Sequence, residues 1–262
     1  MSSPASSWLL SNHRSGASRS PVNRLICFPP AGTGIGFFRN WHTLLPHQEI
    51  VPVQLPGRDG RFTDPPIDNA HAIAKQVADA ILAEKWESPL LLGYSFGALL
   101  AFETTRILEE KGIQPQHLIV CARSAPQTSP RQSLADLPEE TLLDYVRKLG
   151  GLPKEIEMTP EFIDIFLPIM RSDFRANEDF ACSEEVRINA PITVFNGRHD
   201  QIISNGNTPD WDRRTRNHCQ QIEIDGGHFF IHDQPNSFFE QLSKVVRNAS
   251  SRRQRNTICP CH

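Results

Sequence analysis

The chain has 262 residues and a formal net charge of −3, and one α/β domain with a single sizeable core can occupy this whole length. The small negative charge gives no electrostatic footprint for nucleic acid. No apolar run approaches the roughly 20 residues that a membrane-spanning helix needs. These features argue against a nucleic-acid-binding protein and against an integral membrane protein.

Residues 1–22 are rich in serine, and their one apolar run, Trp8-Leu9-Leu10, is shorter than the core of a signal peptide. We expect these residues to form a disordered leader on a cytoplasmic protein. The six cysteines are scattered, and Cys27 and Cys121 fall in apolar runs typical of buried strands. This distribution indicates reduced core thiols rather than a disulfide framework.

The first strand is expected at Leu25–Phe28, and a glycine-rich loop, 29–36, follows it. Its glycines allow the backbone to approach a ligand closely. The loop lacks the Gly-Lys-Ser/Thr ending of a phosphate-binding loop and does not fit G-x-G-x-x-G. It is therefore either a plain strand–helix loop or, as in α/β-hydrolases, the source of one oxyanion donor. A second strand is expected at Glu49–Leu55, where Pro52 indicates a position near the sheet edge, and a helix at Ala70–Lys85.

The run Leu90–Leu92 is wholly apolar, and G-x-S-x-G, a nucleophile-elbow motif, follows it at 93–97. The motif requires a buried strand before the serine and a helix after it, and a strong helix-forming sequence does run from Phe96 to Lys111. Ser95 would then project from a tight turn at the start of a helix, where N–H groups favour negative charge. The alternative is an ordinary serine in a glycine-flanked turn.

A further buried strand is expected at His117–Ala122, and the alternation of strands and helices indicates a parallel sheet with helical crossovers. From 124 to 187 we find only helical patterns. One helix begins near Leu137 and ends at 150–153, and another has the apolar face Phe162, Ile165, Phe166, Ile169, Met170 and Phe174. This insertion is either a lid over the site or a peripheral helical pair.

The sheet resumes at Ile192–Asn196, which leads to Asp200, and at Gln221–Ile224, which leads to His228. A last helix at about 235–246 completes an α/β-hydrolase domain over 23–248. Residues 249–262 are polar and basic, and we expect a disordered tail. Its ending, Cys259-Pro260-Cys261-His262, offers soft metal ligands, but on a frayed end they are usually incidental.

A serine hydroxyl needs an adjacent base, and that base needs an orienting carboxylate. In α/β-hydrolases the acid and then the histidine follow the serine along the chain, each after a later strand. Asp200 and His228 fit this order, whereas Asp225 lies too near His228 in sequence and His199 comes before the last strand. We therefore predict a Ser95–Asp200–His228 triad performing acyl transfer. The backbone N–H groups of Ala31 and Phe96 would form the oxyanion hole.

Six blocks in this order make residues 23–246 similar to the type II thioesterases, the stand-alone editing enzymes of non-ribosomal peptide and polyketide synthetases. The blocks are Cys27–Gly32, Gln54–Arg58, Gly93–Ala98, Leu149–Gly151, Met170–Phe174 and Gly226–Phe230. The resemblance implies hydrolysis of aberrant acyl thioesters from the phosphopantetheine arm of carrier-protein domains. It implies no metal and no organic cofactor of the enzyme's own.

Two positions depart from the family pattern. Tyr94 and Phe96 stand where members usually carry His and often Met or Leu, and Thr33 stands where the first loop usually has a second glycine. Both departures are expected to line or flank the pocket mouth and so to affect acyl-chain preference. The triad by itself fits a small-molecule carboxylesterase equally well. A non-catalytic hydrolase-fold binding module is the third interpretation.

Overall fold

The structure is a computed structural model and describes residues 7–11, 23–126, 133–150, 159–203 and 208–258. Its strands are β1 (Arg24–Phe28), β2 (Glu49–Pro52), β3 (Leu90–Tyr94), β4 (His117–Cys121), β5 (Ile192–Gly197) and β6 (Cys219–Ile224). Its α-helices are α1 (Trp41–Leu44), α2 (Ala70–Ala83), α3 (Phe96–Glu110), α4 (Glu139–Lys148), α5 (Pro160–Glu178), α6 (Phe230–Asp233) and α7 (Pro235–Ile258). Short 3₁₀ helices are η2 (Ile35–Phe38), η3 (Asp59–Arg61) and η4 (Thr208–Arg214).

The strands form one six-stranded parallel sheet in the order β2-β1-β3-β4-β5-β6. This confirms the predicted parallel α/β architecture. Pro52 lies on the edge strand β2, as predicted, where its missing N–H interrupts no ladder. The register pairs Phe28 with Gly93 and Tyr94 with Cys121. The carboxyl ends of β1, β3 and β4 therefore meet at one edge, which brings the loops that follow them together.

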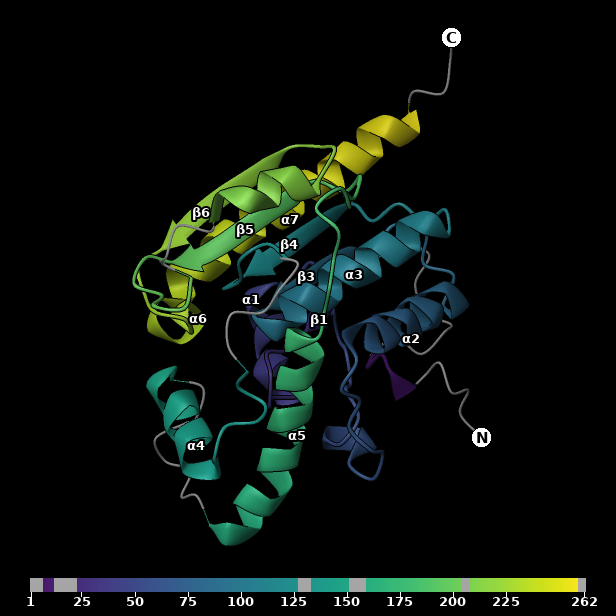
Figure 1. Cartoon of the computed structure of the whole chain (residues 1–262). Helices are drawn as coiled ribbons and strands as arrows, with labels where there is room; N and C mark the ends of the chain where they lie inside the picture. The colour runs from purple at the N-terminus through teal and green to yellow at the C-terminus, as the bar shows by residue number, and fades with distance from the viewer. Residues whose placement is uncertain (1–6, 12–22, 127–132, 151–158, 204–207, 259–262) are drawn as a thin grey trace.

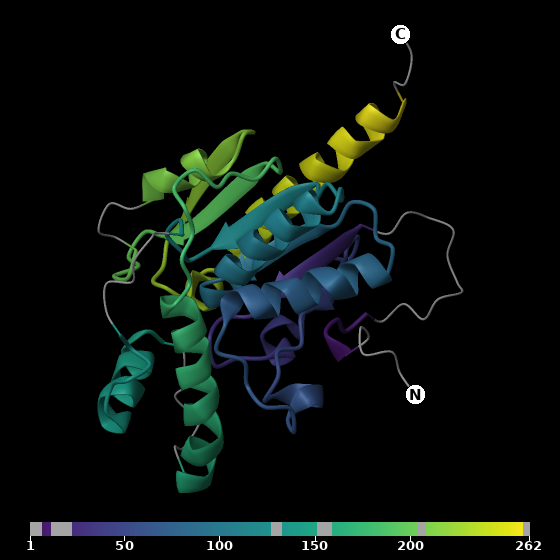
Figure 2. The same cartoon turned by 45° about the vertical axis from the view of Figure 1, so that its right-hand side comes forward.

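Successive side chains of each central strand enter different cores, one on each face of the sheet, because side chains alternate along a strand. Leu91 packs with α2 and α3, whereas its neighbours Leu90 and Leu92 pack with α1 and α7. Figures 1 and 2 show these helix pairs on opposite faces. Cys27 and Cys121 are buried free thiols, and burial raises their pKa well above the usual thiol value. The prediction of reduced core thiols is confirmed for these two.

The insertion between β4 and β5 is helical in its described part, as predicted, and α4 and α5 lie beyond the end toward which the strands point (Figure 1). Residues 127–132 and 151–158 lie outside the described residues. Most of the predicted apolar face of α5 is buried or half-buried against α4 and the sheet domain, but Ile165 is 48% exposed. Its prediction was wrong because the packed arc centres on Phe166, Met170 and Phe174, and Ile165 lies at the solvent edge of that arc.

Both predicted disordered ends need correction. α7 continues to Ile258, well beyond Val246, and the physical reason is that no glycine or proline interrupts residues 249–258. Within the leader, Trp8 and Leu9 are buried, and Leu9 bridges Val53 beside the sheet edge. The short apolar run is thus long enough to dock, although it is too short for a signal peptide. Residues 1–6, 12–22 and 259–262 lie outside the described residues.

Candidate active site

Ser95 occupies the sharp turn between β3 and α3, with the strained backbone angles φ 52° and ψ −114°. Non-glycine residues rarely adopt a positive φ, so the surrounding packing must hold this conformation. A Cβ on Gly93 would lie 2.1 Å from the Gly97 carbonyl oxygen, and one on Gly97 would lie 2.2 Å from that of Phe28. Both glycines of the motif are therefore required by close backbone approach.

The structure brings Ser95, Asp200 and His228 into one hydrogen-bonded chain. His228 Nε2 lies 3.1 Å from Ser95 Oγ, and His228 Nδ1 lies 2.8 Å from Asp200 Oδ2. Asp200 is 1% exposed, and its Oδ1 accepts a 2.9 Å hydrogen bond from the Ile202 N–H. The arrangement can transfer a proton from the serine hydroxyl to an imidazole that a buried carboxylate orients.

The competing acid and base pair with each other. His199 Nε2 lies 3.0 Å from Asp225 Oδ1, and both side chains are about two-thirds exposed. This pair lies on the surface, so it does not provide an alternative partner for Ser95. The loops carrying the predicted acid and histidine are joined by a hydrogen bond from the His199 N–H to the Gly226 carbonyl.

Tyr94 lies beneath the histidine rather than at a pocket mouth, so the expectation for this residue was wrong. Its side chain is fully buried, and its hydroxyl donates a 2.7 Å hydrogen bond to the His228 backbone carbonyl. Strand alternation explains the correction, since Ser95 projects to the loop edge whereas Tyr94 points into the core shared with α7. Burial raises the pKa of Tyr94 well above its usual value, so the hydroxyl is neutral and acts as a donor.

The loop after β1 turns back on itself beside the elbow. The Thr33 N–H donates to the Pro30 carbonyl at 3.2 Å, which leaves Ala31 and Gly32 as the central residues of the turn. Phe96 is the first residue of α3, where an N–H has no intrahelical acceptor. The predicted oxyanion donors Ala31 and Phe96 thus come from two adjoining backbone segments, because β1 and β3 are neighbours. Their role as donors stays a prediction.

Sequence reasoning missed a buried ion pair next to this turn. Arg58, from the loop after β2, donates two hydrogen bonds to Asp173 of α5, at 2.6 and 2.8 Å. Asp173 also accepts the Gly32 N–H at 2.8 Å. Both partners fall within blocks that carried the family resemblance, but no local pattern indicates that the two blocks meet.

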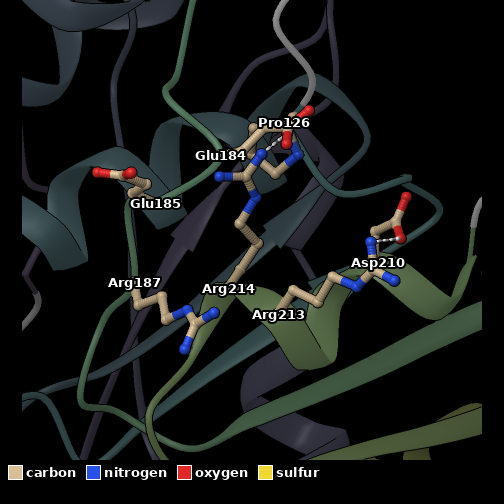
Figure 3. A pocket seen from close by; sticks show the side chains of 7 residues that line it. All are labelled: Pro126, Glu184, Glu185, Arg187, Asp210, Arg213 and Arg214. Carbon is tan, nitrogen blue, oxygen red and sulfur yellow. Dashed lines mark hydrogen bonds and ion pairs between the residues drawn. The ribbon is translucent and has the colours of Figure 1, made fainter.

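A cavity of about 430 Å³ lies elsewhere, and Figure 3 shows its lining: Pro126, Glu184, Glu185, Arg187, Asp210, Arg213 and Arg214. None of the triad residues lines it. Arg214 donates to the carbonyls of Ser183 and Pro126, and Arg213 lies 3.8 Å from Asp210. Two of the arginines that line the cavity are thus already paired. We therefore assign the reactive site to the sheet edge that carries Ser95, Asp200 and His228, not to this cavity.

No group of three or more His, Cys, Asp or Glu side chains suited to hold a metal occurs among the described residues. The Cys259–His262 ending, which offered soft metal ligands, lies outside the described residues. Within the same described ranges, no helix is both long and apolar enough to cross a bilayer.

Comparisons with known proteins agree with this geometry. A family model described as thioesterase domain matches residues 23–246. Linear gramicidin dehydrogenase LgrE of Brevibacillus parabrevis is 32% identical, with 86% of each chain covered. Thioesterase PikA5 of Streptomyces venezuelae is also 32% identical, over 88% of this chain and 84% of its own length. YbtT, the type II thioesterase of the yersiniabactin pathway, is 28% identical with a TM-score of 0.82, over 92% of this chain and 99% of its own.

Proposed function

The chain belongs to the thioesterase domain family, and on this premise we propose that it hydrolyses acyl thioesters carried on the phosphopantetheine arm of a carrier protein. Its service would be that of a type II thioesterase, which clears stalled or wrongly primed acyl groups from a peptide or polyketide synthetase. The observation that carries the hydrolytic part is the hydrogen-bonded chain from Asp200 through His228 to Ser95 at a nucleophile elbow.

The proposed reaction begins when Ser95 Oγ attacks the thioester carbonyl carbon and His228 Nε2 takes the hydroxyl proton. The carbon–sulfur bond then breaks, and the pantetheine thiol leaves with the proton returned by His228. Water, deprotonated by His228, attacks the resulting ester, and the carboxylic acid departs as Ser95 regains its proton. Each step conserves protons and electrons.

Asp200 would hold the imidazole tautomer that presents a free Nε2 to the serine and would stabilise the imidazolium that forms. The N–H groups of Ala31 and Phe96 would stabilise the oxyanion, each worth about 3 kcal/mol. These side chains, two backbone donors and water are sufficient for the reaction. We therefore propose that the enzyme needs no cofactor of its own.

The names of the family and of its relatives support a thioester substrate over an oxygen ester. The family and the relatives PikA5 and YbtT are named as thioesterases, and YbtT belongs to a synthetase pathway. The name of LgrE includes a dehydrogenase activity, but the loop after β1 in this chain does not fit the G-x-G-x-x-G dinucleotide fingerprint. The triad supports hydrolysis in preference to hydride transfer.

The testing experiment compares one short acyl group in three forms: on a purified carrier protein, on a pantetheine mimic and as an oxygen ester. We expect the highest kcat/KM for the carrier-bound thioester. Ser95→Ala serves as the blank, with circular dichroism to show that it remains folded. Its kcat should fall by about 10⁴-fold or more, because the nucleophile is lost.

The other outcomes select the remaining interpretations. Equal or better turnover of the oxygen ester would make the protein a general carboxylesterase with the same triad. Binding of acyl-carrier protein without turnover by wild type would indicate a binding module. Full activity in Ser95→Ala would remove the mechanism altogether.

A further inference from the structure

Helix α5 contacts the oxyanion loop directly, although the two are far apart in sequence. A Cβ on Gly32 would lie 2.2 Å from Met170 Cε and 3.1 Å from Phe166, both on α5. The same helix carries Asp173, whose side chain is 1% exposed. The helix therefore presents one buried carboxylate to the turn that contains Ala31.

The Asp173 carboxylate is directed at one backbone amide. Its Oδ2 accepts the Gly32 N–H at 2.8 Å, and this bond fixes the orientation of the peptide group that joins Ala31 to Gly32. The same bond engages the Gly32 N–H. The neighbouring N–H, that of Ala31, is the predicted oxyanion donor.

Arg58 in turn fixes the carboxylate. Its guanidinium donates to both Asp173 oxygens, and Nη1 also donates to the Thr33 carbonyl at 3.1 Å. Arg58 Nε donates to its own loop at the Pro56 carbonyl, at 3.3 Å. Bidentate pairing adds geometric specificity as well as energy, so it sets the direction of the carboxylate. The loops after β1 and β2 and the helix α5 therefore meet in one buried hydrogen-bond network.

We propose that Asp173, held by Arg58, is a positioning residue for the oxyanion hole, and that it aligns the Ala31 N–H through its bond to Gly32. This inference rests on the proposed function, since it assigns a part in the same acyl transfer. Docking of α5 does not by itself require an ion pair, because Met170 and Phe166 already pack on the turn. Replacing a buried pair by apolar side chains is often neutral or stabilising. The pair instead orients a single backbone amide, the N–H of Gly32.

The test uses three variants. The double variant Arg58→Met with Asp173→Leu removes the pair without leaving an unpaired buried charge. Asp173→Asn and Arg58→Lys each change one partner. The matched control is Glu103→Gln, which neutralises a carboxylate as buried as that of Asp173, at 1% exposure, although its partner Arg106 is 27% exposed. Glu103 pairs with Arg106 and His71 rather than with the loop after β1. Turnover is measured with p-nitrophenyl acetate, an activated ester whose small acyl group makes little demand on the acyl pocket. Thermal unfolding is measured alongside.

A second readout isolates the oxyanion. A trifluoromethyl ketone carrying the acyl chain forms a tetrahedral adduct with Ser95, whereas a thioether analogue binds without forming an oxyanion. For the double variant and for Asp173→Asn we expect kcat and trifluoromethyl ketone affinity to fall about 10- to 100-fold, with little change in KM or thioether affinity. In Arg58→Lys, kcat and ketone affinity should fall less, because lysine keeps the positive charge. Glu103→Gln should change only the melting temperature.

Two outcomes would overturn the inference. One is a double variant with wild-type kcat and ketone affinity. The other is a loss that is equal for ketone and thioether, which would indicate a general effect on the pocket. Neither result would touch the proposed function, which fails separately if wild type shows no preference for the carrier-bound thioester or if Ser95→Ala stays active.

Discussion

The two sides of Ser95 are held in place by different parts of the molecule. On one side, His228 and Asp200 follow β6 and β5, and Tyr94, the residue before the nucleophile, donates to the His228 carbonyl. On the other side, the turn at Ala31–Gly32 is contacted by α5, with Asp173 lying 141 positions along the chain from Gly32. The side of His228 and Asp200 is thus built by the sheet, and the side of the Ala31–Gly32 turn is completed by the helical insertion.

This difference separates the parts of the site that can vary independently. Any sheet that orders these strands places the acid, the histidine and the serine at the same edge. The Ala31–Gly32 turn also contacts α5, so we expect a change in the insertion to alter turnover without a change in the triad.

Asp200→Asn should give the largest loss on the sheet side. The amide keeps an acceptor for the Ile202 N–H, but it can stabilise neither the imidazolium nor the required tautomer of His228. We expect kcat to fall about 10⁴-fold with the fold intact, measured by ester and thioester turnover together with circular dichroism.

The surface pair gives the control for this prediction. Asp225→Asn removes the negative charge beside His199 on the neighbouring loop and should leave kcat unchanged. If Asp225→Asn and Asp200→Asn lost activity equally, the assignment of the acid would be wrong.

Gly32→Ala tests the insertion side with an intermediate expected effect. Gly32 has φ 71°, and the added methyl would overlap Met170. The left-handed conformation alone costs an alanine about 1–2 kcal/mol. We expect kcat to fall about 10-fold as the turn moves, and Met170→Ala in the same chain to restore part of it by making room.

Gly112→Ala separates backbone strain from contact with α5. Gly112 has a similar φ of 81°, and a Cβ there meets nothing within 4 Å. This control should lose comparable stability and keep full activity. A Gly32→Ala enzyme that Met170→Ala does not improve would show that α5 does not set the turn.

The sheet side could be predicted from sequence because each of its residues is adjacent to a strand. Ser95 and Asp200 follow largely apolar runs, His228 follows the alternating strand Gln221–Ile224, and chain order in this fold predicts their roles. The same local patterns predicted the parallel sheet and the edge position of Pro52, both of which the structure confirms.

The insertion side could not be predicted, because no local pattern records which helix packs on which loop. Arg58 and Asp173 each look like an ordinary polar residue in its own segment, and their pairing depends on the docking of α5. The exposure of Ile165 has the same cause, since it depends on which residues of α5 pack against their neighbours. Helical or strand periodicity predicts which side chains share a face. Which residues that face contacts is decided by tertiary structure.

Tyr94→Phe, on the sheet side, should give the smallest loss of activity. The ring stays in the core, but the His228 carbonyl loses a donor, which costs about 1–3 kcal/mol of folding stability. One neutral hydrogen bond contributes about 0.5–1.5 kcal/mol, so we expect kcat to fall about 2- to 10-fold with KM unchanged. Thr193→Val, which removes the buried hydroxyl 2.8 Å from His117, should cost similar stability and no activity. If the two variants had identical kcat, Tyr94 would stabilise the core without aligning His228, and the sheet would position the histidine through the Asp200 bond alone.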